Sequence, residues 1–275
     1  MKVASYTTFT KDVRAKGLEY ALQHSAALGF DAIEVIPSRR DPVPTRAQVK
    51  AARSRFDAYG LPVVCYSAVA DLYTDSAADV ETLKRHAEFA AVLGSPYLHH
   101  TLFHSLSQKE NLPAYGEMLP RVVEAAARVA DYAATLGITC LYEPQGLYFN
   151  GIEGLGQFFA EIKAHCPNVG ICADAGNPLF VHCDPIALAH AFAKDVRHVH
   201  VKNYSFSKTE PTADERYLLK NGEWLGAAPL DRGDIHILTF LNALPDYNGP
   251  VSLEWHASDD EIKAAIAYLR NLSHL

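Results

Sequence analysis

The sequence predicts a single (β/α)8 barrel of the TIM type, and three observations lead to this fold. First, short β-rich runs alternate strictly with longer helical patterns, which implies parallel strands joined by right-handed crossovers. Second, the β-rich runs are almost continuously apolar, as strands are when both of their faces are buried. Third, eight such units fit into 275 residues, and a closed barrel of this kind takes about 250 residues. An open, doubly wound sheet is the alternative fold.

The expected strands are short and rich in β-branched and aromatic residues, beginning with Lys2–Tyr6. We place the eight strands at residues 2–6, 32–36, 61–67, 96–101, 138–143, 169–174, 197–202 and 251–255. Nothing in the composition divides the chain, so we expect one domain over residues 1–275.

A helical pattern follows each strand, and glycine ends four of the helices because it tolerates the left-handed conformation. Asp184 caps another helix that has Pro185 in its first turn, and we expect Asp234 to cap the next one. The expected helices cover residues 18–28, 45–59, 78–93, 114–136, 154–165, 235–244 and 259–271, with a further helix beginning at Pro185.

One long stretch, residues 203–232, follows the seventh strand without a clear pattern. It carries four aromatic residues, namely Tyr204, Phe206, Tyr217 and Trp224. Loops of this length in a compact domain usually have a function, so we expect a lid over the barrel.

Charge and cysteine content exclude several classes of protein. The net charge is −7 and the pI is near 6.0, and no cluster of lysines and arginines occurs, so nucleic acid and anionic membranes are not expected partners. The five cysteines are scattered without a C-x-x-C motif, which indicates buried thiols in a reducing compartment. The sequence shows neither a signal peptide nor a window of 18 apolar residues, so we expect a cytoplasmic protein.

Polar residues stand at the carboxyl ends of the expected strands, where barrel enzymes have their active sites. Four successive strands end in Glu143, Asp174, His200 and Glu254. A single such residue is usually a loop acceptor or a core histidine, but four aligned ends are not independent accidents. Three carboxylates this close would repel each other unless they stayed partly protonated or a cation lay between them. His198 shares a strand face with His200 but lies farther from the strand end, so we expect it to be structural.

The donor set predicts one divalent metal ion. Carboxylate and imidazole ligands without a thiolate suit Mn²⁺, which we place first, and also Mg²⁺, Co²⁺ or Fe²⁺, with Zn²⁺ as a further alternative.

The ordered motifs of the whole chain resemble those of the xylose isomerase-like barrel superfamily, in particular its sugar phosphate isomerase/epimerase group. The motifs are IEV (33–35), LYEP (141–144), ICADAGN (171–177), HVHVKN (198–203), RGDIH (232–236) and YNGPVSLEW (247–255). The group includes ketose 3-epimerases, hydroxypyruvate isomerases, inosose dehydratases and 3-dehydroshikimate dehydratases, and relatives are often homo-oligomers. The resemblance implies the same four metal ligands, with Glu143 and Glu254 also acting as the acid/base pair.

The chain departs from the group at three places. Asn177 stands where many members have a histidine, so a mechanism that needs a proton relay there is put in doubt. Gln145 replaces a histidine or asparagine, and Asp231 replaces the first glycine of a Gly-x-Gly. The endonuclease IV branch needs further histidine and acidic ligands, and the acidic charge argues against DNA as the substrate.

The resemblance implies an isomerase or epimerase of a small polyhydroxy carbonyl compound. The metal would acidify the C–H beside a carbonyl, one carboxylate would remove the proton to give an enediolate, and the other would return it. A dehydratase that expels a hydroxyl from the same intermediate is the alternative, and a non-catalytic sugar-binding barrel is a third reading. We expect the substrate to be bound by Glu34, His100, Asn177, Lys202, Arg232 and His256. Glu34 could instead pair with Arg39 or Arg40.

Overall fold

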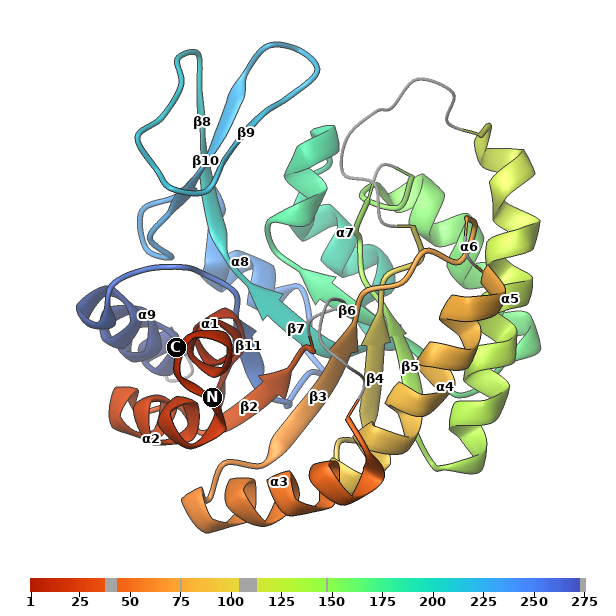
Figure 1. The fold of residues 1–275 in the computed structure, drawn as a ribbon. Coiled ribbons are helices and arrows are strands. Elements are labelled where there is room, and N and C mark those ends of the chain that lie inside the picture. Colours follow the sequence, from red (N-terminus) through yellow and green to blue (C-terminus); the bar gives the residue numbers. More distant parts are fainter. Residues whose placement is uncertain (38–43, 75, 104–112, 147, 273–275) are drawn as a thin grey trace.

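A computed structural model describes residues 1–37, 44–74, 76–103, 113–146 and 148–272. Eight parallel strands form a closed barrel in the order β1-β11-β7-β6-β5-β4-β3-β2, with helices around the outside (Figure 1). The predicted (β/α)8 barrel is therefore confirmed. Its strands are β1 Val3–Ser5, β2 Ala32–Val35, β3 Val63–Ala68, β4 Tyr97–His100, β5 Thr139–Tyr142, β6 Val169–Asp174, β7 Val196–Val201 and β11 Val251–Leu253.

The helices begin and end close to the predicted positions, because glycines and caps stand where the sequence patterns change. Gly29 and Gly60 adopt the left-handed conformation after α2 and α3, with φ of 93° and 64°. The helices are α1 Thr7–Lys16, α2 Leu18–Leu28, α3 Arg46–Tyr59, α4 Ser76–Leu93, α5 Tyr115–Thr135, α6 Ile152–His165, α7 Pro185–Phe192, α8 Ile237–Asn242 and α9 Asp259–Leu272, with short 3₁₀ helices at Asn177–Val181 and Ala193–Asp195. None of the described helices is long and apolar enough to cross a bilayer.

All five cysteines are free, and burial agrees with the prediction for four of them but not for Cys183, which is partly exposed. Four of them are buried, and Cys65, Cys172 and Leu141 form a small apolar cluster apart from the main core. The main core joins the strands to the helices around them.

Residues 203–232 are not the irregular loop that the sequence indicated. They contain the strands β8 Asn203–Ser207, β9 Arg216–Leu218 and β10 Trp224–Ala228, which pair as an antiparallel sheet. Figure 1 shows this sheet standing out from the barrel beyond β7. Aromatic residues attach the base of the sheet to the barrel. The rings of Tyr204 and Tyr217 pack on Phe180, with centroids 6.0 and 4.9 Å away.

Two further local predictions were wrong. Helix α1 was not expected from its sequence, TTFTKDVRAK. Only Phe9 and Asp12 of this helix are buried, so its sequence carries no apolar stripe that would indicate a helix. Asp234 does not cap α8, since its carboxylate accepts a hydrogen bond from the backbone of Phe206 in the projecting sheet. The side chain of His236 caps α8 instead.

His24 ties three helices together, and we expect this to make stability depend on pH. It lies 2.7 Å from Asp12 in α1 and 3.1 Å from Asp259 in α9. Burial lowers the pKa of His24, but the two carboxylates outweigh burial and raise it above 6.5. A raised folded-state pKa stabilises the fold below pH 6.5, and this contribution disappears as the pH rises through the folded value.

His24→Asn should therefore lower the Tm by about 2 °C at about pH 5.5 and by less at about pH 8.5. Thermal unfolding at the two pH values measures this difference. His165→Asn, a change at an exposed histidine of α6, is the control and should show no such difference. An equal loss at both pH values would contradict the expectation.

Candidate metal centre

The four predicted metal ligands lie together at the carboxyl ends of four neighbouring strands. Glu143 follows β5, Asp174 ends β6, His200 lies in β7 and Glu254 follows β11. One ligand atom from each residue lies within 4.8 Å of all the others. The Nδ1 atom of His200 is 3.2 Å from Glu143 Oε1, 3.3 Å from Glu254 Oε2 and 3.9 Å from Asp174 Oδ2.

The geometry of this cluster fits a metal ion. Ligand atoms that bind one ion at about 2.1 Å are roughly 3.0–3.4 Å apart, close to most of these separations. Within the described part of the chain, Asp174 Oδ2 and Glu254 Oε2 are buried without a hydrogen-bond partner. Their contacts are ion pairs instead, with Lys202 Nζ 3.2 Å from Asp174 Oδ2 and His200 Nδ1 3.3 Å from Glu254 Oε2. Three carboxylates and one imidazole are a donor set that suits a divalent ion.

The protein gives the carboxylates of the cluster different acidities. Burial raises the pKa of Asp174 to about 7, with Lys202 opposing the rise and Glu143 adding to it. Burial also raises the pKa of Glu143, but the charges of His99 and His200 outweigh burial and leave it well below its usual range. Glu143 is therefore ionised at neutral pH, as a base must be.

Two of the predicted substrate-binding residues contact the ligands directly. Asn177 Nδ2 donates to Glu143 Oε1 at 2.9 Å, and its backbone N–H donates to Asp174 Oδ1 at 2.5 Å. The ammonium of Lys202 lies 3.2 Å from Asp174 Oδ2 and 3.0 Å from Glu254 Oε1. Its stem runs so close to Gly176 that a Cβ there would come within 2.7 Å of Lys202 Cγ. Lys202 is thus a buried counter-cation for two of the four ligands.

Replacing Lys202 by methionine should strengthen divalent metal binding by about tenfold or more, because a neighbouring positive charge that repels the ion is removed. The protein without metal should melt at a lower temperature, since two buried carboxylates lose their partner. Titration with Mn²⁺ and thermal unfolding in a chelator measure the two effects.

Lys11→Met is the matched control, because Lys11 is an exposed lysine of α1 on the cavity beside Glu254. Weaker metal binding by Lys202→Met than by this control would show that the ammonium helps to hold the site together.

The cluster opens to solvent on the side of Glu254. The side chain of Glu254 is 24% exposed, whereas those of Glu143, Asp174 and His200 are at most 3% exposed. A cavity of about 500 Å³ adjoins Glu254, and it is lined by Tyr6, Thr7, Thr10, Lys11, Arg14, Ala15, Ile36 and His256. His256 thus lies at the opening, and it is 3.5 Å from Glu215 of the projecting sheet.

Sequence reasoning missed two residues that the structure brings to the centre. Tyr6 is the residue after β1, and its ring lies tilted against that of His200 with centroids 5.0 Å apart. An aromatic residue after the first strand would have been the signal. His99 Nε2 lies 3.1 Å from Glu143 Oε2.

The prediction for His100 does not agree with its position. Its ring packs against Tyr142, 5.2 Å away, in the layer between the strands and α6, while His99 faces the centre. The two residues alternate across β4, and the sequence did not indicate which of them faces inward.

Two predicted substrate-binding residues remain. Arg232 lies away from the four ligands, and Glu34 contacts one of them, His200, from inside the barrel. The side chain of Arg232 is 71% exposed and pairs with Asp231, so nothing in its contacts indicates a ligand. Glu34 is fully buried and contacts His198, His200 and Ser67, so its carboxylate faces other protein groups rather than the opening. Arg39 and Arg40, its alternative partners, lie outside the described residues.

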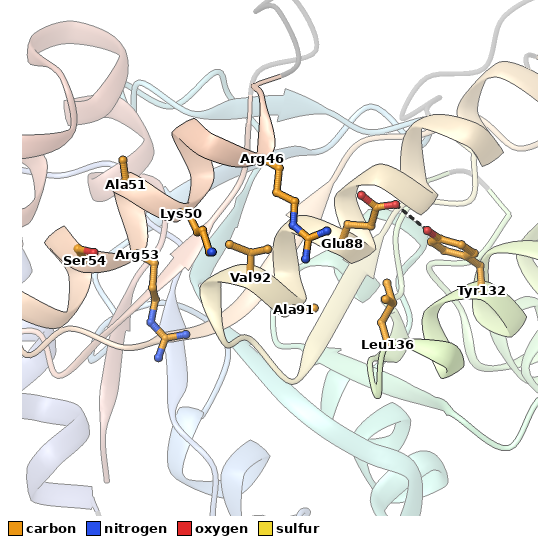
Figure 2. Close-up of a pocket in the computed structure, with 10 residues that line it drawn as sticks. All are labelled: Arg46, Lys50, Ala51, Arg53, Ser54, Glu88, Ala91, Val92, Tyr132 and Leu136. Atoms are coloured by element: carbon orange, nitrogen blue, oxygen red, sulfur yellow. Dashed lines mark hydrogen bonds between the residues drawn. The ribbon is translucent and has the colours of Figure 1, made fainter.

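A larger hollow lies on the outside of the barrel, between α3, α4 and α5 (Figure 2). It has a volume of about 880 Å³, and its polar side chains include Arg46, Lys50, Arg53 and Glu88. Glu88 already accepts a hydrogen bond from Tyr132 at 2.6 Å. The hollow lies on the helical side of the barrel, so we place the functional site at the strand ends instead.

Comparison with known families and structures agrees with this fold. Residues 22–272 match the model of a family described as xylose isomerase-like TIM barrel. No curated protein matches the chain.

Several solved structures resemble the chain over almost its whole length. D-allulose 3-epimerase from Methylomonas sp., in complex with D-allulose, is 21% identical, with 98% of this chain and 96% of that chain covered and a TM-score of 0.76. The probable 3-DHS dehydratase AsbF from Bacillus anthracis is 17% identical, with 98% and 99% covered and a TM-score of 0.74. A barrel protein from Mycobacterium smegmatis in complex with magnesium is 18% identical, with 98% and 96% covered and a TM-score of 0.74.

Proposed function

Because this chain belongs to the xylose isomerase-like TIM barrel family, we propose that it is a divalent-metal-dependent isomerase or epimerase of a small ketose or related hydroxy-keto compound. The observation that carries the proposal is the convergence of Glu143, Asp174, His200 and Glu254, whose ligand atoms all lie within 4.8 Å of one another. D-allulose 3-epimerase is among the proteins of similar structure, which supports a ketose as substrate.

When bound, the metal would polarise a carbonyl and an adjacent hydroxyl of the substrate and so acidify the C–H between them. Glu143 is suited to remove that proton, because it is ionised and its Oε2 faces His99 while Asn177 fixes its Oε1. Glu254 is suited to deliver a proton, because it is the most exposed ligand and borders the cavity where a substrate can lie. Glu143 and Glu254 stand on the outer two of the four strands, which places them at the two ends of the ligand row.

A metal-dependent dehydratase is the second candidate, and one observation favours it. Expulsion of a hydroxyl needs an acid next to the leaving group, and Lys202 is a buried ammonium in contact with Glu254. AsbF, a probable dehydratase, has a similar structure.

The deciding experiment incubates the metal-loaded protein with ketohexoses in D₂O, beginning with D-allulose, and follows the substrate by NMR. Deuterium incorporation beside the carbonyl, with the sugar skeleton retained, is expected for an isomerase or epimerase. Net loss of water would identify the dehydratase. Absence of both reactions, together with absence of metal binding, would contradict the proposal and leave the sugar-binding barrel.

A further inference from the structure

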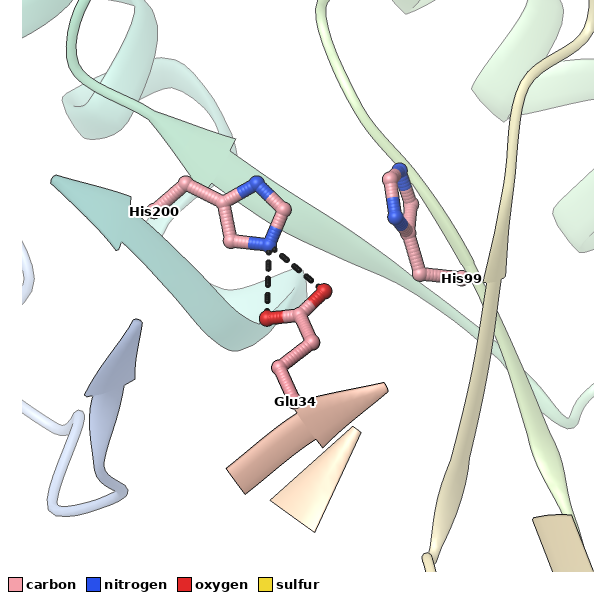
Figure 3. Close-up of side chains that lie close together, drawn as sticks. All are labelled: Glu34, His99 and His200. Carbon is pink, nitrogen blue, oxygen red and sulfur yellow. Dashed lines mark hydrogen bonds and ion pairs between the residues drawn. The ribbon is translucent and has the colours of Figure 1, made fainter. Parts of the chain in front are cut away.

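A layer of buried polar residues lies directly beneath the four ligands, on the inside of the barrel. Glu34 in β2 is its centre, with a carboxylate that is completely buried. Figure 3 shows this carboxylate facing the ring of His200, with His99 beside them. Both oxygens of Glu34 lie 3.0 Å from His200 Nε2. His200 therefore stands between Glu34 on one side and the ligand cluster on the other.

The donors of this layer follow from the fact that an ionised carboxylate only accepts hydrogen bonds. The Glu34 carboxylate faces a hydroxyl and two imidazole nitrogens, those of Ser67, His198 and His200, and is therefore arranged as an acceptor. The proton between Glu34 and His200 must then sit on His200 Nε2. Nδ1 of the same ring points at the three ligand carboxylates, and its lone pair is thus free to bind a metal ion among them.

Two further side chains fix Glu34 in place. His198 Nε2 lies 2.9 Å from Glu34 Oε2 and also 2.9 Å from Ser252 Oγ. The Ser67 hydroxyl donates to Glu34 Oε1. Strands β3 and β7 thus hold the Glu34 carboxylate, and such a satisfied network gives a side chain one orientation.

The hydrogen bonds also connect Glu34 to the proposed base. Because the Ser67 proton goes to Glu34, Ser67 Oγ must accept from His99 Nδ1, 2.9 Å away. The other nitrogen of His99 faces Glu143. Ser67 and His99 are partners in register on β3 and β4, so the backbone itself sets this contact.

The geometry points to Glu34 as the positioning residue of the metal centre, which orients His200 for metal binding through Nδ1 and, through Ser67, sets the ring of His99 against Glu143. This inference rests on the proposed metal site. This positioning role differs from the substrate-binding role that the sequence suggested. Glu34 contacts His200 on the side of the ring that faces away from the other three ligands. A carboxylate behind a metal-bound histidine typically contributes 10- to 100-fold to metal affinity.

The test compares metal binding by the wild type and by Glu34→Gln, which keeps the shape of the side chain but allows its amide to donate to His200 Nε2. We expect Co²⁺ affinity to fall 10- to 100-fold and the Co²⁺ absorption spectrum to change, because the wrong tautomer of His200 removes a ligand. Ser252→Ala is the matched control, since the hydroxyl of Ser252 bonds to His198 and only its strand pairs with that of His200. This control should retain the wild-type affinity and spectrum.

A measurement on the wild type does not depend on the folding of a variant. In Zn²⁺-loaded protein with ¹⁵N-labelled histidine, NMR should show one histidine with metal on Nδ1 and a slowly exchanging proton on Nε2, absent from His200→Gln. Metal on Nε2 of His200, or a Glu34→Gln variant with unchanged Co²⁺ affinity and spectrum, would overturn the inference. Failure of the wild type to bind Co²⁺ or Zn²⁺ would instead contradict the proposed function.

Discussion

Glu143→Gln is expected to abolish proton exchange and turnover, with a loss of about 10³-fold or more. The amide keeps the volume of the side chain but cannot take a proton from carbon. Nitrogen atoms of Asn177, His99 and His200 lie against the two oxygens of Glu143. An amide has only one oxygen, so it cannot keep all three of these contacts. The base and one metal ligand are lost together, so this substitution should have the largest effect on activity.

The measurement is deuterium incorporation into the ketose in D₂O, followed by NMR and compared at equal metal occupancy. Glu153→Gln serves as the control, because Glu153 is an exposed glutamate in the first turn of α6. It should exchange at the wild-type rate. Wild-type exchange by Glu143→Gln would show that another group is the base.

Removal of the metal should stop the reaction and destabilise the protein. Three carboxylates lie in a cluster with one imidazole and one ammonium, and a divalent ion relieves their mutual repulsion. At a metal concentration of about 100 times the Kd, binding contributes about 2.7 kcal/mol, which corresponds to roughly 5–10 °C in Tm for a chain of this size.

Dialysis against a chelator, followed by readdition of Mn²⁺, tests this expectation by activity and by thermal unfolding. Mn²⁺ should restore both quantities in the wild type and should leave the Tm of Asp174→Asn almost unchanged. Full activity of the chelated protein would exclude a metal-dependent reaction. A shift in Tm that persists in Asp174→Asn would place the metal elsewhere on the chain.

The meeting of the four candidate ligands could be predicted because the argument needed only the end of each strand. Parallel strands of a barrel deliver their carboxyl ends to one rim, so Glu143, Asp174, His200 and Glu254 had to meet once the strands were recognised. The two-residue period puts His198 and His200 on one face, and His200 could be chosen because it is nearer the carboxyl end of the strand. His198 does lie deeper, against Ser252 and Glu34.

The sequence could not predict which face of a strand each side chain occupies, nor the contacts that join several strands. His99 faces inward and His100 outward because β4 pairs in register with Ser67 and Ala68, which no local pattern reveals. The direction of Glu34 is set by Ser67 of β3 and by His198 and His200 of β7, two strands that lie far apart in the sequence. The sheet of residues 203–232 depends on pairing between short strands, such as Phe206 with Leu225, whose individual signals are weak.

The seam of the barrel links the metal centre to the order in which the chain is made. Strand β11 closes the barrel by pairing with β1 on one side and β7 on the other, and Glu254 is the next residue after it. A nascent chain that has not reached β11 presents Glu143, Asp174 and His200 beside an open seam. For the proposed metal site, Glu254 joins the other three residues only with the strand that completes the sheet, so full affinity for metal would require the closed barrel.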